Sequence, residues 1–541
     1  MSRKLIAALS AATMFHAVPA HAEWLEARSP HFIVYADMSE SDLRERIVRL
    51  EEFDSALRGL FKPESEDRAT IYVLGSIADI QRLAGDRRVG GFYSSTAQGS
   101  QGFVPERLPR ELPGMSAESI LFHEYTHHML LTNLEENYPG WVHEGLAELF
   151  MTARFADNGD VVIGAPNESR GWAMNGLSRW DVRRLIESDE KPPKGDEVIE
   201  RYSRGWAVMH YLLISGKREG QFFKYVNGIN RGTPALKAAE DAFGNLDKLN
   251  TEVDVYLRST RLPTKLIPAG MRQAAGEVTV SQLTAGQRDI LPFRIRSAVG
   301  VNYETAGPLA EKARIAAAPF GSDSFVQRTM TEIEYDAASL AARKREAATA
   351  ADFAIADAAA DRALAADSAN TMAMIYKGRI AAMVAAGGDT SKWAEARRWF
   401  IAANKSNPNS ALAYQLYYET FLASGAKPSD AAVTGMRRAV VLAPADLNLR
   451  AQLAVELARR GELKDAERVL RAVAFNPHAK PDNKYTKLLQ SIEGGASGDK
   501  LAARIDELKL GKLTEFSLEK PAADDEDETD AVAYSSAPEA R

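Results

Sequence analysis

The sequence contains no cysteine, which excludes disulfide bonds and every metal site built from thiolates. A metal ion bound by this chain must therefore use histidine and carboxylate ligands. No stretch beyond residue 22 approaches the ~20 apolar residues that a membrane-crossing helix needs. The formal net charge is −7 and no basic patch is present, so the sequence predicts neither a membrane span nor a nucleic-acid partner.

The length of 541 residues predicts three or four domains, and an apolar fraction of 45% is ordinary for globular protein. Residues 1–22 have the order of a secretory signal: basic Arg3 and Lys4, an apolar core from Leu5 to Val18, and the cleavage site Ala20-His21-Ala22. A cytosolic N-terminal helix is the alternative. Cleavage removes two positive charges and takes the net charge from −7 to −9. We expect an exported protein, periplasmic in a Gram-negative source, where a chain without cysteine suits the oxidising compartment.

The stretch 116–150 contains the residues most suited to catalysis. It begins with SAESILFHEYTHHML, in which His123, Glu124 and His127 form an H-E-x-x-H motif inside an apolar run of helical period. Positions i and i+4 of a helix share one face, so the two histidines supply two of the three protein ligands of a catalytic zinc. Glu124 is then placed to act as general base on a water at the fourth position. Two surface histidines on an ordinary helix are the alternative interpretation.

A third ligand must come from a separate segment, and WVHEGLAELF at residues 141–150 offers one. Glu144 lies seventeen residues after His127, beyond a polar turn, and Pro139 suits the first turn of a new helix. Glu148 lies four residues later on the same face, where its carboxylate can accept the second ring N–H of a zinc-binding histidine. Two histidines and one carboxylate with an open position favour zinc, one ion per chain.

HEYTH followed by WVHEGLAE resembles the gluzincin metallopeptidases of the peptidase MA superfamily, which include thermolysin and the leukotriene-hydrolase-type aminopeptidases. The resemblance implies an α+β thermolysin-like zincin domain at residues 23–260. It also implies that His123, His127 and Glu144 bind zinc. Glu124 is then the base, and Glu148 orients one of the zinc-binding histidines. The shorter turn before Glu144 indicates a branch other than the aminopeptidases. Their G-A-M-E-N strand motif is absent, which favours an endopeptidase or a specialised hydrolase.

The segment VIERYSRGWAVMHYLLISG at residues 198–216 predicts a largely buried helix with Tyr202 just at its start. It resembles the segment of leukotriene-hydrolase-type enzymes whose tyrosine donates a hydrogen bond to the oxyanion of the tetrahedral intermediate. That match implies Tyr202 as a catalytic residue, with a tyrosine that caps a core helix as the alternative. We expect His128, His143 and His210 to be packed or hydrogen-bonded, although His143, next to Glu144, could also contact substrate.

Residues 23–115 predict a small α/β unit with strands at 31–36 and 69–74, helices at 39–61 and 77–84, and a hairpin at 90–104 around Gln98-Gly99. In gluzincins an edge strand before the zinc helix pairs with extended substrate, and this hairpin occupies that place; a purely structural hairpin is the alternative. Further helices are expected at 222–229, 234–243 and 246–257. Residues 261–309 indicate a linker or small β segment, with strands at 278–280 and 290–295.

Residues 310–490 are alanine-rich and helical in period throughout. Two sets of residues have the spacing of the second helix of a tetratricopeptide repeat (TPR): Ala396, Phe400, Ala403 and Pro408, then Ala432, Met436, Ala439 and Pro444. A third set ends at Pro477, so the prolines are 36 and 33 residues apart, near the ~34-residue period of that family. The resemblance implies an all-α array that binds protein or peptide, with a structural cap as the alternative. The tail 491–541 is acidic and is expected to be disordered from about residue 519.

The sequence therefore predicts an exported zinc-dependent peptidase whose TPR-like array binds protein substrate or a protein partner. Glu124 takes a proton from the attacking water, and Tyr202 stabilises the oxyanion together with zinc. Two alternatives stay open: a zinc-binding scaffold that is catalytically idle, and a zinc hydrolase with a non-peptide substrate. The intact Glu124 argues against the first, because a retired site has no need of its base. The edge hairpin is the only feature against the second.

Overall fold

The structure is a computed structural model. It describes residues 24–61, 68–87, 89–108, 116–131, 138–166, 180–189, 197–259, 261–269, 276–474, 483–510 and 515–518. The expected secretory signal at 1–22, the acidic end of the tail at 519–541 and Pro477 lie outside the described residues. None of the helices in the described ranges combines the length and the hydropathy that a membrane-crossing segment needs.

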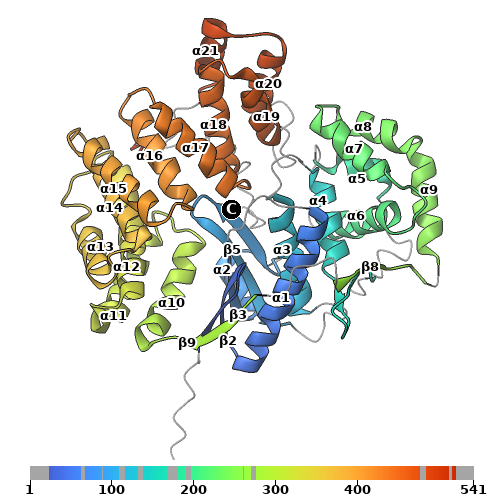
Figure 1. Ribbon diagram of the computed structural model, residues 1–541, viewed down its shortest axis with the longest axis horizontal. Coiled ribbons are helices and arrows are strands. Elements are labelled where there is room, and N and C mark those ends of the chain that lie inside the picture. Colours follow the sequence, from blue (N-terminus) through green and yellow to red (C-terminus); the bar gives the residue numbers. More distant parts are fainter. Residues whose placement is uncertain are drawn as a thin grey trace, which may run out of the picture.

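A mixed six-stranded sheet forms the N-terminal region, in the order β4-β5-β3-β2-β1-β9 (Figure 1). Strands β2, β3 and β5 run parallel, whereas β1, β4 and β9 are antiparallel to their neighbours. The strand bounds are β1 Trp24–Arg28, β2 Phe32–Asp37, β3 Ala69–Ser76, β4 Phe92–Thr96, β5 Gly99–Arg107 and β9 Thr279–Gln282. The hairpin expected around Gln98-Gly99 is confirmed, and its first strand, β4, is an edge of the sheet.

Helices cover both faces of this sheet. Side chains alternate along its central strands, and both faces carry apolar residues that pack against helices. In β2, Phe32 and Val34 face helices α1 (Glu40–Phe61) and α3 (Ala117–Leu131). Tyr35, the residue after Val34, faces α2 (Ile77–Ala84) and α10 (Ala285–Ala298) on the opposite side. Helix α3, which carries the H-E-x-x-H motif, is therefore fixed against the sheet on its apolar side.

The strand expected at 290–295 is wrong, because these residues lie within α10. Thr284 and Gln287 form a capping box at its first turn, which favours a helix start there. Ile290, Leu291 and Ile295 are then spaced to bury one helical side. The strand expected at 278–280 is observed as β9, which pairs with β1. Strand β1 was not predicted. A small second sheet was not predicted either; it consists of β6 Arg154–Phe155, β7 Val161–Ile163 and β8 Lys265–Ile267.

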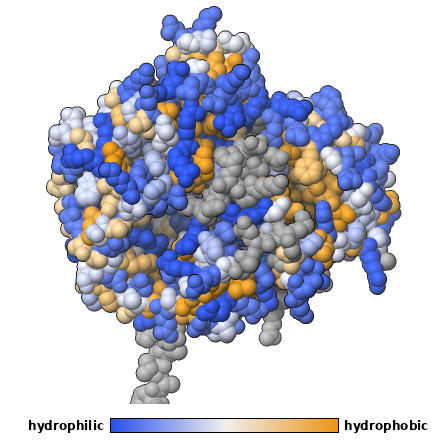
Figure 2. Space-filling model, viewed as in Figure 1, coloured by the Kyte–Doolittle hydropathy of each residue, from blue (hydrophilic) through white to orange (hydrophobic). Residues whose placement is uncertain are grey.

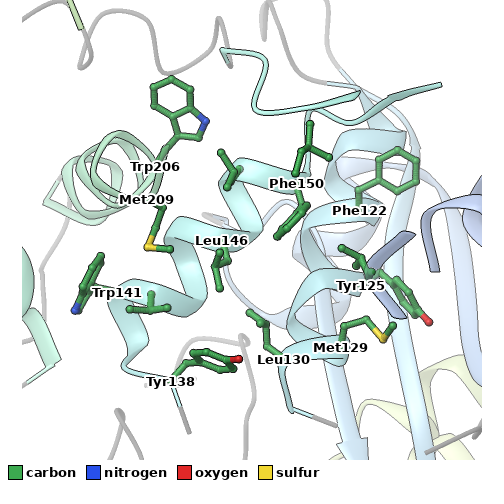
Figure 3. Packing of buried hydrophobic residues seen from close by; sticks show 14 of the residues in the cluster. Phe122, Tyr125, Met129, Leu130, Tyr138, Trp141, Leu146, Phe150, Trp206 and Met209 are labelled. Carbon is green, nitrogen blue, oxygen red and sulfur yellow. The ribbon is translucent and has the colours of Figure 1, made fainter. Parts of the chain in front are cut away.

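Helix α4 (Gly140–Phe150) packs between α3 and α6 (Glu197–Leu213), and Figure 3 shows Met209 pointing toward α4 from α6. Two glycines make the α4–α6 crossing close. A Cβ atom on Gly145 would lie 2.6 Å from Met209 Cγ and 2.8 Å from the carbonyl oxygen of Gly205. The neighbouring helices are α5 Val182–Ile186, α7 Gln221–Asn230, α8 Ala235–Phe243 and α9 Leu246–Leu257.

The C-terminal half is an all-helical array, joined to the sheet region through α10 and α11 (Ala306–Ala317). Successive helices pair, and Figure 1 shows the pairs following an arc along one side and the top of the sheet. The pairs are α12 Ser324–Arg345 with α13 Ala354–Ala366, α14 Thr371–Ala386 with α15 Lys392–Ser406, α16 Ala411–Ala423 with α17 Asp430–Leu442, α18 Leu447–Arg459 with α19 Leu463–Ala474, and α20 Lys484–Glu493 with α21 Gly498–Glu507. Ala396 and Phe400, which have the spacing of the second helix of a repeat, lie in α15, the second helix of its pair, and are fully buried.

Candidate metal centre

Helices α3 and α4 bring three ligand atoms together. Nε2 of His127 lies 3.2 Å from Nε2 of His123, and the two histidines share one side of α3 as their spacing predicts. Oε2 of Glu144 lies 3.4 Å from Nε2 of His123 and 3.6 Å from Nε2 of His127. The three predicted ligands thus form a nearly equilateral triangle, although the third comes from a different helix.

This triangle fits a tetrahedral zinc site. Zinc bonds of ~2.0–2.1 Å to histidine nitrogen and carboxylate oxygen place neighbouring ligand atoms ~3.3 Å apart at the tetrahedral angle. The observed edges of 3.2, 3.4 and 3.6 Å lie close to that value. Among the described residues three ligand atoms face one point, which is the number of protein ligands that catalytic zinc sites use, with the fourth position left to water or substrate. The residues present are therefore suited to a metal ion, and their donor set favours zinc.

The charges around the triangle also suit a cation. Burial alone would lower the pKa of His123, but the carboxylates of Glu144, Glu124 and Glu148 outweigh it and raise that pKa to about 9. Burial would raise the pKa of Glu144, but His127, His123 and Arg201 hold it well below its ordinary value. The site therefore carries an excess of carboxylate charge in a buried setting, which a divalent ion would compensate.

Glu148, fully buried in α4, lies on the opposite side of His123 from Glu144. Its Oε1 is 3.7 Å from Nδ1 of His123, whereas Glu144 faces Nε2 of the same ring. The distance is longer than a hydrogen bond, yet the pairing is the one in which a carboxylate orients a metal-binding histidine through its other nitrogen.

Glu124, 6% exposed, sits where the sheet edge meets α3. The backbone of Gly91, just before β4, passes beside it: a Cβ atom there would lie 3.4 Å from Glu124 Cγ and 2.7 Å from Ile120 Cγ2. Only a residue without a side chain allows this approach. The edge strand therefore begins next to the predicted base. The sequence predicted the hairpin but not its position beside Glu124.

Tyr202 reaches the same site from α6, with its ring centroid 6.1 Å from that of His123. It lies within the helix, so the prediction that it sits at the helix start is wrong, and so is the alternative of a capping tyrosine. The Glu144 carboxylate, and then burial, raise the pKa of Tyr202 well above its ordinary value. The hydroxyl therefore stays protonated and keeps the hydrogen that a hydrogen-bond donor needs.

The other histidines are accounted for mainly by packing. His128 is buried, and its Nδ1 is hydrogen-bonded to the hydroxyl of Tyr93 on β4; burial lowers its pKa to about 3. His210 is buried between the carbonyl oxygen of Gly164 and the hydroxyl of Tyr256, each 2.9 Å from one of its nitrogens. His143 is buried with its ring 6.2 Å from that of His127. The first two are the hydrogen-bonded core residues that were expected.

A second group of potential ligands, His31, Glu51 and Asp54, does not fit a metal as well. Arg58 donates from Nε to both oxygens of Asp54, at 2.9 and 2.8 Å, so a cation already compensates this carboxylate. The hydroxyl of Tyr125 also donates to Asp54, at 2.5 Å, and the His31 ring bonds Glu51 at 2.8 Å. This network ties α1 to α3 and orients the helix that carries the candidate ligands.

Arg201 is the residue near the site that the sequence did not single out. It lies buried in α6 directly before Tyr202, and its charge lowers the pKa of Glu144. The available signal was an arginine next to the candidate tyrosine in a helix that is otherwise predicted to be buried.

A comparison with known families covers this part of the chain. Residues 118–235 match the family model described as "Protein of unknown function (DUF1570)". No curated protein and no solved structure matches the chain. The matched range contains α4, α6 and nearly all of α3, and with them all of the candidate site residues. The chain therefore carries a DUF1570 domain at residues 118–235.

Proposed function

We propose that this protein is an exported zinc-dependent peptidase of the gluzincin type, acting as an endopeptidase. The observation that carries the proposal is the triangle of ligand atoms from His123, His127 and Glu144, with edges of 3.2, 3.4 and 3.6 Å. Export rests on the signal-like residues 1–22 and is part of the proposal. The mixed sheet beside the motif helix supports a thermolysin-like arrangement. Strand β4 is the candidate for the edge strand that pairs with substrate in such enzymes.

A zinc ion held by these three residues would polarise a scissile carbonyl and lower the pKa of a bound water. Glu124 is the residue that accepts the proton from that water and passes it to the leaving amine. Tyr202 donates its hydroxyl hydrogen bond to the oxygen on which negative charge develops. The outer edge of β4 offers backbone groups to an extended substrate, and this edge starts beside Glu124.

The helical array, as a TPR-like assembly, would present protein substrate or hold a partner. Its arc passes the β4–β5 hairpin, and the turn of that hairpin is anchored in it: Asp446 Oδ2 accepts a hydrogen bond from the backbone N–H of Ala97 at 2.8 Å. A polypeptide bound by the array would thus be held near the edge strand proposed to receive the scissile segment.

The test is the metal content of the purified full-length chain, measured by mass spectrometry beside two variants. About one zinc per chain is expected for the wild type, and most of it is lost in Glu144→Ala because one of three ligands is removed. Glu118→Ala is the control: this glutamate also lies in α3 but pairs with Arg49, outside the triangle. Absence of zinc from the wild type after zinc is supplied would contradict the proposal. Zinc retained at full affinity by Glu144→Ala would show that Glu144 is not the third ligand.

Glu124→Gln separates the peptidase from a scaffold that binds zinc without catalysis. The variant should keep its zinc, because Glu124 is not among the three ligands, and should lose cleavage of an unstructured protein such as casein. Since general base catalysis contributes ~10²–10⁴-fold, the rate should fall by at least that order. Unchanged turnover would remove Glu124 from the mechanism. A wild type that binds zinc but cleaves no peptide would favour the idle scaffold or a non-peptide substrate.

A further inference from the structure

Four residues near the C-terminus, Glu515–Phe516–Ser517–Leu518, lie across the array and are here called the C-terminal strap. The strap and Leu510 before it contact the first helix of successive pairs in reverse order. Arg459 of α18 donates to the carbonyl of Leu510 at 3.3 Å. Glu419 of α16, Arg379 of α14 and Arg343 of α12 then contact the strap itself. Leu510 and the strap thus follow the array back from α18 toward α12.

Glu515 makes the most specific contacts of the strap. Its carboxylate faces the guanidinium of Arg379, with distances of 2.7 Å from Nε to Oε1 and 2.9 Å from Nη2 to Oε2. Its backbone N–H donates to Oε2 of Glu419 at 2.9 Å, and its carbonyl accepts from Nη2 of Arg343 at 2.5 Å. The side chain and both backbone groups of one residue are therefore recognised by three different helices.

Phe516 fills an aromatic site beside this ion pair. The residue is 1% exposed, and its ring centroid lies 6.3 Å from that of Phe400 and 6.4 Å from that of Trp393, both on α15. Arg343 Nε also reaches the carbonyl of Ser517 at 3.3 Å. The contacts are those by which proteins hold extended peptides: backbone hydrogen bonds, one charge and one apolar anchor.

Arg379 is held in place by the array independently of the strap. Its guanidinium lies over the rings of Tyr376, at 4.8 Å, and Tyr335, at 5.5 Å, so its orientation is fixed by α12 and α14. Arg379 is 8% exposed and Glu419 is 1% exposed. Buried ion pairs add little net stability, so this pair alone does not hold the strap permanently in place. A planar guanidinium fixed in this way is preformed for a carboxylate.

The same arginine borders a cavity of about 480 Å³ between the array and the sheet. Its walls include Ser94 and Thr96 of the edge strand, Tyr376 beside Arg379, and Asn409 before α16. On the visible outer face of the array, by contrast, hydrophobic residues stand in small groups among hydrophilic ones (Figure 2). Arg379 thus belongs both to the contacts of the strap and to the wall of this cavity.

We propose that the array residues around the strap form a binding site for a peptide with a glutamate followed by an aromatic residue, and that residues 515–518 occupy it in cis until a partner or substrate segment displaces them. The proposal deepens the binding role proposed for the array. It does not depend on the metal centre, since the strap contacts described above are made with α12, α14, α15 and α16.

The test uses the full-length chain and a fluorescent peptide with the sequence of residues 508–521. In a chain carrying Glu515→Gln and Phe516→Ala the strap is weakened, so the peptide should bind at least tenfold more tightly than to the wild type. The wild-type strap competes because a tethered segment acts at an effective concentration of ~mM. In the weakened chain Arg379→Gln should abolish binding. Arg437→Gln is the control and should leave binding unchanged, because Arg437 pairs with Glu462 and Asp465 at the start of α19.

Two further peptides, one with Glu515→Gln and one with Phe516→Ala, test the site without changing the array, and they are decisive if Arg379→Gln fails to fold. Each of the two should bind the weakened chain at least tenfold less tightly than the natural peptide. In the wild type, excess natural peptide should speed hydrogen exchange at residues 515–518. No binding to the weakened chain, equal binding of a scrambled peptide, or equal affinity for wild type and weakened chain would overturn the proposal. Binding of the peptide should persist when a chelator removes the metal ion. The outcome for the strap is then independent of whether the peptidase proposal holds.

Discussion

At the scale of single residues, the candidate site depends on atoms that the sequence places far apart. The pair His123 and His127 is predictable because one helical turn sets their spacing. The position of Glu144 within 3.6 Å of both rings requires the packing of α3 on α4. Tyr202 was identified only by resemblance, and its place inside α6 differs from the expected one because the helix begins earlier, at Glu197. Arg201 carried too general a pattern to be singled out.

Replacing Tyr202 with phenylalanine removes the hydroxyl and keeps the ring that packs 6.1 Å from His123. If the hydroxyl stabilises an oxyanion, kcat should fall by roughly 10- to 1000-fold with zinc content unchanged, which is the size of a lost oxyanion donor. Steady-state kinetics on a casein-derived peptide, with metal analysis alongside, measures both quantities.

Tyr211→Phe is the matched control for this experiment. Tyr211 lies in the same helix, but its hydroxyl donates to Glu252 at 3.1 Å on the side of α9. Its removal should leave kcat within about twofold. If Tyr202→Phe also leaves kcat unchanged, the hydroxyl has no part in catalysis and Arg201 becomes the next candidate for that donor.

At the scale of elements, local sequence predicted most of the helices and the central strands. Capping residues and apolar spacing are local signals, so α1, α2, α7, α8 and α9 were expected near their observed bounds. Residues 290–295 were misread because four apolar residues within six, Ile290, Leu291, Phe293 and Ile295, fit both a strand and a helix. The capping box at Thr284 decides for the helix. The pairing of β1 with β9 joins segments about 250 residues apart, for which no local signal exists.

Gly145→Ala tests the close crossing of α4 and α6. The added Cβ would lie 2.6 Å from Met209 Cγ and 2.8 Å from the Gly205 carbonyl oxygen, and the backbone atom cannot turn away as a side chain can. We expect a loss of stability of ~1–3 kcal/mol, seen as a lower Tm, together with weaker zinc binding because Glu144 is the adjacent residue. Thermal unfolding followed by circular dichroism, and a zinc titration, measure the two effects.

The same substitution at Gly321 gives the control. Gly321 has helical backbone angles, φ −60° and ψ −21°, and a Cβ atom there would have no neighbouring atom within 4 Å outside the adjacent residues. Alanine restricts the unfolded chain more than glycine does where the native backbone suits it, so the Tm should stay the same or rise slightly. Equal effects of the two substitutions would show that the α4–α6 contact is not as close as described.

At the scale of the whole molecule, the β4–β5 hairpin connects the candidate metal centre with the helical array. One end of the hairpin is Gly91 beside Glu124, and the other is the turn at Ala97, which is buried among the core residues of the array. The sequence predicted a hairpin and a helical array separately. Their contact could not be predicted, because Ala97 and Asp446 are 349 residues apart and neither residue has an unusual neighbourhood in the sequence.

Asp446 holds this connection with both of its carboxylate oxygens. Oδ1 accepts the N–H of Leu449 at 3.0 Å and caps α18, while Oδ2 accepts the N–H of Ala97 at 2.8 Å. In Asp446→Asn only one oxygen can accept, so either the cap or the hairpin bond is lost and a buried N–H faces an NH₂ group. We expect a loss of ~1–3 kcal/mol and faster hydrogen exchange at Ala97 and Gln98. Because the other end of β4 begins beside the predicted base, KM for a peptide substrate should rise as well.

Asp323→Asn is the control, since Asp323 caps α12 through the N–H of Val326 at 3.0 Å and does not contact the hairpin. Asparagine caps helices as well as aspartate does, so this variant should change stability by less than ~0.5 kcal/mol and leave exchange at Ala97 unaltered. Faster exchange at the hairpin turn in Asp446→Asn alone, accompanied by the higher KM, would mean that the array positions the edge strand at the candidate site. Faster exchange with KM unchanged would limit the contact to holding the two halves of the molecule together, and the array would then influence cleavage only by binding substrate.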